Sequence, residues 1–427
     1  MTIEHLHALF LASTGISTDT RKINKGNLFF ALKGENFNAN TFAEKALKLG
    51  AGQAVIDEKK YHQHTGKTIL VNDVLATLQE LSAFHREYLK IPIIVLTGSN
   101  GKTTTKELIQ AVLKEKYNIA ATQGNLNNHI GVPLTLLSMN KSTEMGVVEM
   151  GANHHGEIAF LCELAKPDYG YITNFGKAHL EGFGSLEGVV QAKTELYRYL
   201  KKMDKTVFIN TDDATQVIKT EKQNKITFST ENNSEINIIL KEQNPFLTVI
   251  FQQVEIKSRL TGIYNLSNLA AAIAIGSHFD LTPLEIKKGI ENYSPQNNRS
   301  QFLTKDTNTI LMDAYNANPT SMQAALENFA QLDVPNKIVF LGDMFELGAD
   351  ASMEHEEIAK LTAEKKFKKV YLVGENFCET VVEDKSIVKL KSFEELRKTL
   401  DATKIIDSTL LIKGSRGMAM ERILELI

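Results

Sequence analysis

The sequence predicts an α/β protein of three domains, with a mostly parallel sheet in the central domain. Three observations support this fold class. The chain has 427 residues, and a single domain commonly has about 150. From Ile91 onward, short β-branched runs alternate with helix-like stretches, which is typical of a parallel sheet covered by helices. Two breaks, at Ile91-Pro92 and at residues 294–301, divide the chain into three parts.

The N-terminal part, residues 1–88, is expected to be a small α/β domain. Its apolar runs predict strands at 28–32, 53–57 and 68–71, and its amphipathic stretches predict helices at 42–51 and 76–90. The last helix should end near Ile91, because a residue that precedes proline disfavours the helical conformation.

The central part, residues 89–294, repeats a strand–turn–helix pattern. Strands are expected at 93–96, 145–150, 169–175 and 206–210, and helices at 106–117, 154–165, 188–200, 267–279 and 282–293. Residues 225–262 contain several strand-like runs, which predict a β-rich insertion or flank. We therefore expect one large parallel sheet with helices on its faces.

The alternation resumes in residues 295–427, which predicts a C-terminal Rossmann-like domain. Its strands are expected at 309–315, 337–343, 369–374 and 408–414, with a helix after the last of them. The helix after the first strand follows Pro319, and either Thr320 or Ser321 is expected to be its N-cap.

The composition argues against several classes of protein. A formal net charge of −3 gives no overall attraction to nucleic acid or to an anionic membrane. Cys162 and Cys378 are too few and too far apart for a disulfide framework or a cysteine-rich zinc site. No stretch approaches the roughly 18 apolar residues of a membrane span, and residues 1–15 lack the basic region of a signal peptide. We expect a cytoplasmic protein that binds no nucleic acid and has no membrane span.

Residues 91–107 read IPIIVLTGSNGKTTTKE and predict a phosphate site. A strand that ends in a glycine turn and opens a helix presents free N–H groups and a positive helix end to an anion. Lys102 can reach the β- and γ-phosphates, and the Thr103 hydroxyl can bind magnesium. Leu96 stands where the strict pattern has glycine, so a threonine-capped turn with a solvated lysine is the alternative. We interpret the stretch as the nucleotide site of a P-loop ATPase-type domain.

Further polar residues follow the neighbouring strands, where ligands of parallel sheets bind. Glu149 stands at a strand end and could hold magnesium, with an ordinary strand-end acid as the alternative. Asn174 and His179 follow the next strand, where His179 alone would be an ordinary loop histidine. Lys193 lies in a predicted helix, and by itself it would be a solvated cation.

Three polar segments outside these strands are also candidates. The amide-rich turn at 121–133, the segment 313–321 and the segment 411–422 each follow an apolar run. An Asn/Gly loop, helix capping and an ordinary strand-to-helix turn are their respective alternatives. Arg299, in the second break, could face either neighbouring domain.

Taken together, these segments resemble the Mur ligases of peptidoglycan synthesis. The phosphate loop TGSNGKTTTKE is similar to that family's variant, and GNLNNHIGVPLTLL, VVEMGANHHGEI, DAYNANPTSM, LGDMFELG with a following His355, and LIKGSRG are more specific. The resemblance extends from residue 17 to the last predicted helix. Tyr264 stands where the family pattern GxHNxxN has histidine.

The resemblance implies ATP and Mg²⁺ as cofactors and assigns roles to single residues. Lys102, Glu149, His179 and Lys193 would be catalytic, and the magnesium positions would be Thr103, Glu149, His179 and a carbamylated Lys193. ATP would contact Thr97, Gly98, Ser99, Asn100, Gly101, Lys102, Thr103, Thr104, Asn265, Asn268, Arg299 and Asp313. The other substrates would contact Thr18, Asp19, Thr20, Arg21, Asn125, Asn127, Asn128, Tyr315, Asn316, Asn318, Ser321, Lys413, Ser415 and Arg416.

The reaction implied is the ATP-dependent joining of D-alanyl-D-alanine to UDP-N-acetylmuramoyl-tripeptide through an acyl phosphate, by a monomeric enzyme. The first domain would bind the UDP end, the second ATP, and the third would bring the dipeptide and close on ATP. The alternatives are another amide ligase, of the Mur or folylpolyglutamate synthase type, and a non-catalytic nucleotide-binding regulatory protein.

Overall fold

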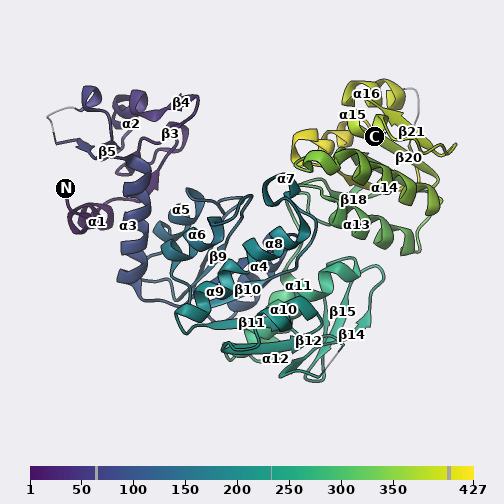
Figure 1. The fold of residues 1–427 in the computed structure, drawn as a ribbon, viewed down its shortest axis with the longest axis horizontal. Coiled ribbons are helices and arrows are strands. Elements are labelled where there is room, and N and C mark those ends of the chain that lie inside the picture. The colour runs from purple at the N-terminus through teal and green to yellow at the C-terminus, as the bar shows by residue number, and fades with distance from the viewer. Residues whose placement is uncertain (63–65, 232, 402–404) are drawn as a thin grey trace.

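The computed structural model describes residues 1–62, 66–231, 233–401 and 405–427. Figure 1 shows three parts: the N-terminal part at the upper left, the central part below and the C-terminal part at the upper right. Each part contains its own parallel or mostly parallel sheet, and the predicted α/β fold class is confirmed. The long helix α3 (Val74–Leu89) leads from the first part to the second.

The N-terminal part has a four-stranded sheet in the order β1-β2-β5-β6, with all pairs parallel. Asp73 caps α3 by accepting a hydrogen bond from Ala76 N, and Lys90 ends the helix in the left-handed conformation. The other helices are α1 (Ile3–Ala12) and α2 (Ala43–Lys48), and the strands are β1 (Ile16–Ser17), β2 (Leu28–Phe30), β3 (Lys33–Gly34), β4 (Phe37–Asn38), β5 (Gln53–Ile56) and β6 (Thr68–Leu70).

The central part has a seven-stranded sheet in the order β13-β12-β11-β10-β7-β9-β8, with every pair parallel. Apolar clusters cover both faces, one with α4 and α11 and the other with α6, α8 and α9. The strands are β7 (Ile93–Thr97), β8 (Ile119–Ala121), β9 (Met145–Glu149), β10 (Tyr169–Ile172), β11 (Thr206–Asn210), β12 (Lys225–Ser229) and β13 (Ile236–Asn237). The helices are α4 (Lys102–Leu113), α5 (Gly131–Leu137), α6 (Glu157–Ala165), α7 (Leu180–Phe183), α8 (Leu186–Lys193), α9 (Glu195–Lys202), α10 (Ala214–Lys219), α11 (Leu266–His278) and α12 (Pro283–Asn292).

Two segments of the central part differ from the sequence prediction. The single helix expected at 188–200 is broken at Thr194 into α8 and α9. The Thr194 hydroxyl donates to Val190 O at 2.7 Å, and such a side-chain bond competes with regular helix. The β-rich stretch is also divided, because β12 and β13 join the large sheet. Only β14 (Ile239–Glu242), β15 (Thr248–Phe251) and β16 (Val254–Lys257) form a separate antiparallel sheet.

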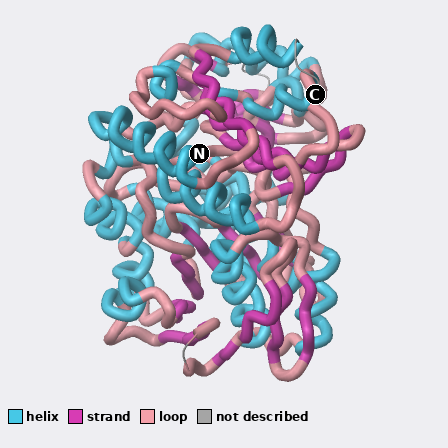
Figure 2. The backbone as a smooth tube through the Cα atoms, turned by 90° about the vertical axis from the view of Figure 1, so that its right-hand side faces the viewer, coloured by secondary structure: helices cyan, strands magenta, loops and turns pink. Residues whose placement is uncertain are grey.

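The C-terminal part has a six-stranded sheet in the order β17-β18-β22-β19-β20-β21, in which only the β17–β18 pair is antiparallel. Figure 2 shows this part at the top, with helices beside its strands. The strands are β17 (Gln301–Lys305), β18 (Asn308–Asp313), β19 (Lys337–Gly342), β20 (Lys369–Val373), β21 (Ile387–Leu390) and β22 (Thr409–Lys413). The helices are α13 (Pro319–Gln331), α14 (Ala351–Glu364), α15 (Glu375–Cys378) and α16 (Phe393–Asp401).

Two local predictions for the C-terminal part are wrong. The N-cap of α13 is Asn318 and not Thr320 or Ser321: its side chain accepts from Ser321 N, and Pro319 is the first helical residue. The segment after β22 is not an α-helix but two 3₁₀ turns, which the left-handed residue Ala419 separates.

The elements leave short connections at the expected boundaries. Helix α3 ends at Leu89 before β7, and α12 ends at Asn292 before β17. The limits at 88/89 and 294/295 stay predictions. In the described ranges, every helix is too short or too polar to cross a bilayer.

Candidate active site

The turn between β7 and α4 has the form of a phosphate-binding loop. Gly98 and Gly101 have φ angles of +141° and +77°, which side-chain-bearing residues rarely adopt. A Cβ atom on Gly98 would lie 2.0 Å from Thr173 Oγ1, and one on Gly101 would lie 2.5 Å from Asn268 Oδ1. These contacts explain why both positions are glycine. The N–H groups at the start of α4 are left for an anion.

Lys102 is folded back over this loop. Its Nζ donates to Gly98 O at 2.7 Å and to Ser99 O at 3.1 Å. Burial, together with the nearby charge of Arg299, lowers the pKa of Lys102, while Glu149 opposes the shift. The ammonium group is therefore held at the loop, where a phosphate would meet it.

The loop opens into a cavity of about 930 Å³ between the central and C-terminal parts. Most of the predicted site residues line it: Ser99, Asn100, Gly101, Lys102, Thr103, Thr104, Asn125, Asn127, Asn128, Glu149, His179, Asn265, Asn268, Arg299, Asp313, Tyr315, Asn316, Asn318, Ser321 and Lys413. The predicted residues outside its lining are Thr97, Gly98, Lys193, Ser415, Arg416, Thr18, Asp19, Thr20 and Arg21.

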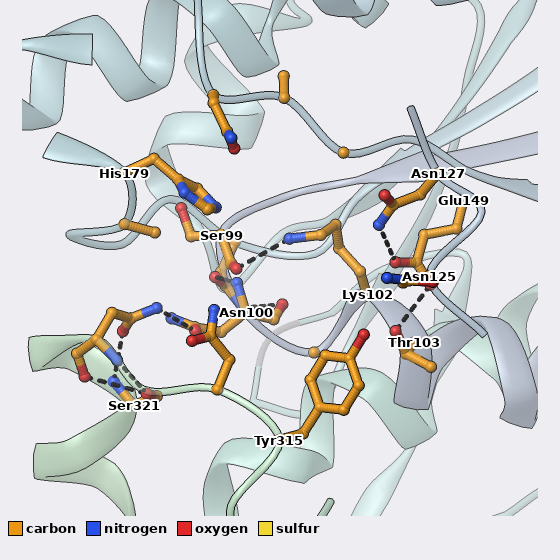
Figure 3. A pocket seen from close by; sticks show the side chains of 18 of the residues that line it. Ser99, Asn100, Lys102, Thr103, Asn125, Asn127, Glu149, His179, Tyr315 and Ser321 are labelled. Carbon is orange, nitrogen blue, oxygen red and sulfur yellow. Dashed lines mark hydrogen bonds between the residues drawn. The ribbon is translucent and has the colours of Figure 1, made fainter. Parts of the chain in front are cut away.

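Glu149 is a buried carboxylate that accepts a hydrogen bond from the first turn of α4, next to the loop. Thr103 Oγ1 donates to Glu149 Oε2 and Asn127 Nδ2 donates to Glu149 Oε1, each at 2.8 Å. Figure 3 shows these three side chains together beside Lys102. Behind them, Lys106 Nζ donates to Thr122 O at 2.7 Å, and Thr122 Oγ1 accepts from Glu149 N at 3.0 Å. A hydroxyl and a carboxylate form a set of hard oxygen ligands that suits Mg²⁺, which commonly binds one or two carboxylates together with phosphates.

His179 lies on the other side of Lys102 from Glu149 (Figure 3). Its Nδ1 contacts Glu346 Oε2 of the C-terminal part at 2.5 Å, and this contact lowers the pKa of Glu346. Across the described ranges, no three His, Cys, Asp or Glu side chains are grouped closely enough to hold a metal. Of the predicted magnesium positions, Thr103, Glu149 and His179 line the cavity without forming a ready-made cluster, and Lys193 lies outside its lining.

Lys193 is not the solvated helical lysine that its local sequence predicts. It is 1% exposed, its Nζ donates to Ala152 O at 3.1 Å, and the Phe183 ring lies 5.0 Å from that atom. Burial and the nearby Lys102 lower the pKa of Lys193 to about 7. The neutral amine that this environment favours is the form that reacts with carbon dioxide to give a carbamate.

Hydrogen bonds and an ion pair join the two walls of the cavity. Asn318 Nδ2 donates to Asn100 Oδ1 at 2.7 Å, so the N-cap of α13 touches the phosphate loop. Lys177 N donates to Thr320 Oγ1 at 3.0 Å, and Lys177 Nζ pairs with the buried Glu354 at 2.6 Å.

Charged side chains of the segment 294–301, of β18 and of β22 also line the C-terminal wall of the cavity. Asp313 accepts from Ser300 N at 3.0 Å and pairs with Lys413 at 2.5 Å. The Arg299 guanidinium lies 3.5 Å from the centre of the Tyr315 ring. Arg299 and Lys413 thus face the cavity from one side, which favours an anionic ligand there.

The predicted residues outside the cavity have other contacts. Ser415 Oγ accepts from Phe345 N at 2.9 Å, and the largely exposed Arg416 pairs with Glu421. In the N-terminal part, Asp19 pairs with Arg21. The substrate contacts assigned to these residues stay predictions.

Several lining residues were not assigned a role from the sequence. They include His155, Tyr264, Phe345 and Glu346. Tyr264 departs from a family pattern, and Phe345 and Glu346 lie within LGDMFELG. The motifs therefore identified these segments but did not indicate which side chains face the cavity.

Comparison with known proteins identifies the family. The Mur ligase middle domain matches residues 96–276, and the Mur ligase glutamate ligase domain matches residues 298–416. The UDP-N-acetylmuramoyl-tripeptide–D-alanyl-D-alanine ligase of Bacillus subtilis is 36% identical over 84% of this chain and 80% of its own. The crystal structure of MurF from Acinetobacter baumannii superposes with a TM-score of 0.86 at 28% identity, over 98% of this chain and 97% of the other. MurF from Thermotoga maritima, solved with ADP, gives 0.83 at 26% identity over 98% and 97%. The chain belongs to the Mur ligase family.

Proposed function

We propose that the chain joins D-alanyl-D-alanine to UDP-N-acetylmuramoyl-tripeptide at the expense of ATP, in the synthesis of peptidoglycan precursors. The observation that carries this proposal is the cavity that a phosphate-binding loop shares with the C-terminal part. The named activity of the Bacillus subtilis relative supports the choice of substrates. The ADP in the Thermotoga maritima structure supports ATP as the nucleotide.

In the first step, the terminal carboxylate of the tripeptide attacks the γ-phosphate of ATP, giving an acyl phosphate and ADP. The obstacle is repulsion between two anions. Lys102 and the N–H groups at the start of α4 would hold the phosphates, and Arg299 adds positive charge from the C-terminal wall. These groups lower the repulsion and keep the reacting atoms in line.

Thr103, Glu149 and His179, which line the cavity, would hold magnesium together with a carbamylated Lys193, whose Nζ contacts the lining residue Ala152. Bound there, the metal would neutralise phosphate charge and fix the orientation of the oxygens. The Thr103–Glu149 pair supplies an oxygen ligand set. Lys193 is buried, and burial together with the charge of Lys102 lowers its pKa, so loss of its positive charge would relieve repulsion within the site.

In the second step, the amine of the dipeptide attacks the acyl phosphate and inorganic phosphate leaves. An acyl phosphate hydrolyses in water, so the contacts that join the two walls, such as Asn318–Asn100 and Lys177–Glu354, would also protect it. The N-terminal part, with the turn at 18–21, would hold the UDP end. Cytoplasmic location and the monomeric state are further predictions of the same proposal.

Mass spectrometry of the product tests the proposal. The purified chain, incubated with ATP, Mg²⁺, UDP-N-acetylmuramoyl-tripeptide and D-alanyl-D-alanine, should give the UDP-linked pentapeptide and an equal amount of ADP. Replacing the dipeptide with L-glutamate separates this activity from that of a folylpolyglutamate synthase type of ligase. ATP turnover with glutamate and none with the dipeptide would refute the substrate assignment, and no turnover with any amine would favour a regulatory protein.

A further inference from the structure

Four carboxylates among the described residues line the cavity. Of these four, only Glu346 has a carboxylate oxygen without a hydrogen bond or an ion pair to a described residue. Glu149 and Asp313 each have both oxygens in hydrogen bonds or ion pairs. Glu157 accepts from two backbone N–H groups and contacts His154. Glu346 contacts His179 through Oε2, while its side chain is half exposed and its Oε1 has no hydrogen bond or ion pair to a described residue. Glu346 is therefore the carboxylate that can receive a cationic ligand.

The backbone around Glu346 is held in place by three hydrogen bonds. Met344 N donates to His355 Nε2 and Phe345 N donates to Ser415 Oγ, both at 2.9 Å. Glu181 N of the central part donates to Glu346 O at 3.3 Å. Three consecutive residues are thus fixed by His355, Ser415 and the opposite wall. The backbone that carries the Glu346 carboxylate therefore needs little rearrangement when a ligand arrives.

Glu346 is one of sixteen residues other than glycine that have a positive φ in the described ranges. Its φ is +63°, and that of its partner His179 is +54°. Residues other than glycine seldom adopt the left-handed region, and where a fold keeps them there they cluster at ligand clamps and active sites. Here two such residues from opposite walls meet side chain to side chain.

The surroundings of Glu346 suit a small amine substrate. Phe345, Ala317 and Ala324 line the same wall of the cavity and offer small apolar surfaces to methyl side chains. An α-amino group, with a pKa of about 8, arrives mainly as an ammonium ion at neutral pH. A fixed carboxylate beside it gives a charge-assisted hydrogen bond, which is about twice as strong as a neutral one.

We propose that Glu346 binds the ammonium group of the incoming dipeptide through Oε1 and so selects an amine with a free α-ammonium group. This inference rests on the proposed function. It gives the LGDMFELG segment a role: Asp343 O accepts from Ser415 N, Ser415 and His355 fix the backbone, and Glu346 meets the substrate.

The test compares two nucleophiles on the Glu346→Gln variant. D-Alanyl-D-alanine carries the ammonium group, whereas hydroxylamine is uncharged at pH 7.5 and traps the acyl phosphate as a hydroxamate. We expect KM for the dipeptide to rise roughly 10- to 100-fold, with KM for ATP and for the UDP-linked tripeptide unchanged. Hydroxamate formation should keep the wild-type rate.

Asp350→Asn is the matched control, because Asp350 is an exposed acid on the same connection that does not line the cavity. It should leave all three KM values unchanged. An unchanged KM for the dipeptide in Glu346→Gln would overturn the inference. A hydroxamate rate that falls as far as the dipeptide rate would also overturn it, because Glu346 would then act only by positioning His179. Wild-type protein that forms no hydroxamate would refute the proposed function itself.

Discussion

Asn318 donates a hydrogen bond from Nδ2 to Asn100 Oδ1 at 2.7 Å, and the same side chain caps α13 by accepting from Ser321 N at 2.9 Å. One amide therefore starts a helix of the C-terminal part and touches the phosphate loop of the central part. The two roles can be separated by mutation, because the cap needs an acceptor and the loop contact uses a donor.

Asn318→Asp should keep the cap, since aspartate is as good an N-cap as asparagine, and should place a negative charge against the loop. We expect an unfolding temperature close to that of the wild type. KM for ATP should rise roughly 10-fold or more, which is the size of effect seen when a hydrogen bond to a charged group is changed. Asn318→Ala should lose the cap as well, at a cost of about 1 kcal/mol. Calorimetry and initial rates measure the two effects; equal loss of stability in both variants would contradict the separation.

Lys102→Ala should abolish ligation and leave the fold intact. Among the described residues, its Nζ hydrogen-bonds to the loop itself, through Gly98 O and Ser99 O, so its removal takes away the charge that meets phosphate. Circular dichroism and product formation are the measurements. Lys114→Ala, at an exposed position just after the same helix, is the control. Wild-type turnover in Lys102→Ala would remove the basis for the phosphate-site assignment.

Lys193→Ala should lose most of the ligase activity, and a small carboxylic acid such as acetate should restore part of it. The variant leaves space beside Ala152 O and Phe183, and acetate would supply the carboxylate that a carbamate otherwise provides. Rates without acetate and with increasing concentrations of acetate measure the rescue. Lys201→Ala, on the exposed face of α9, should need no acetate. Full activity of Lys193→Ala without any acid would rule out the carbamate.

The N-terminal part should lose stability as the pH falls through the histidine range. His7 Nε2 and His85 Nδ1 lie 3.0 Å apart in a buried pair, and His85 Nε2 bonds to Met139 O of the central part at 2.9 Å. Burial lowers the pKa of both rings, and their mutual repulsion lowers that of His7 further. The unfolded chain therefore binds more protons than the folded one below about pH 6.5.

It follows that the contribution of this histidine pair to the free energy of unfolding is complete above about pH 6.5. The contribution is lost as the pH falls toward the lowered pKa values of the two rings. His7→Phe should reduce the drop in unfolding temperature between pH 7.5 and 5.5, whereas His5→Gln, at an exposed position on the same helix, should not. Thermal unfolding at the two pH values gives the comparison. An equal drop in His7→Phe and in the wild type would show that the pair does not contribute.

The sequence could predict the phosphate loop because all its determinants are adjacent in the chain. The strand, the two glycines and the lysine lie within residues 93–102, and local rules cover them. The parallel sheets were predictable for a similar reason, since their strands and helices alternate with clear periodicity. Even the wrong N-cap was a shift of only two or three residues, because Asn318, Thr320 and Ser321 are all good caps.

The environment of Lys193 and the role of Ser415 could not be predicted in the same way. The burial of Lys193 depends on Ala152 and Phe183, which are brought to it only by tertiary folding. Ser415 follows a strand, and its hydroxyl accepts a hydrogen bond from Phe345 N, 70 positions away in the chain, a contact that the local sequence does not indicate; its substrate contact stays a prediction. Contacts between distant segments decide whether a polar residue faces a ligand or supports the backbone.

We expect the boundary between the two walls of the cavity to separate the proposed activation of the acyl group from the proposed binding of the nucleophile. Thr103, Glu149 and the phosphate loop come from residues 93–149, while Phe345, Glu346 and Ala317 come from the six-stranded unit. Exchanging the C-terminal unit for that of a related ligase should therefore change which nucleophile is accepted and keep the way in which the acyl group is activated. We therefore expect that recombination of the C-terminal unit can change the specificity for the nucleophile while the nucleotide site stays the same.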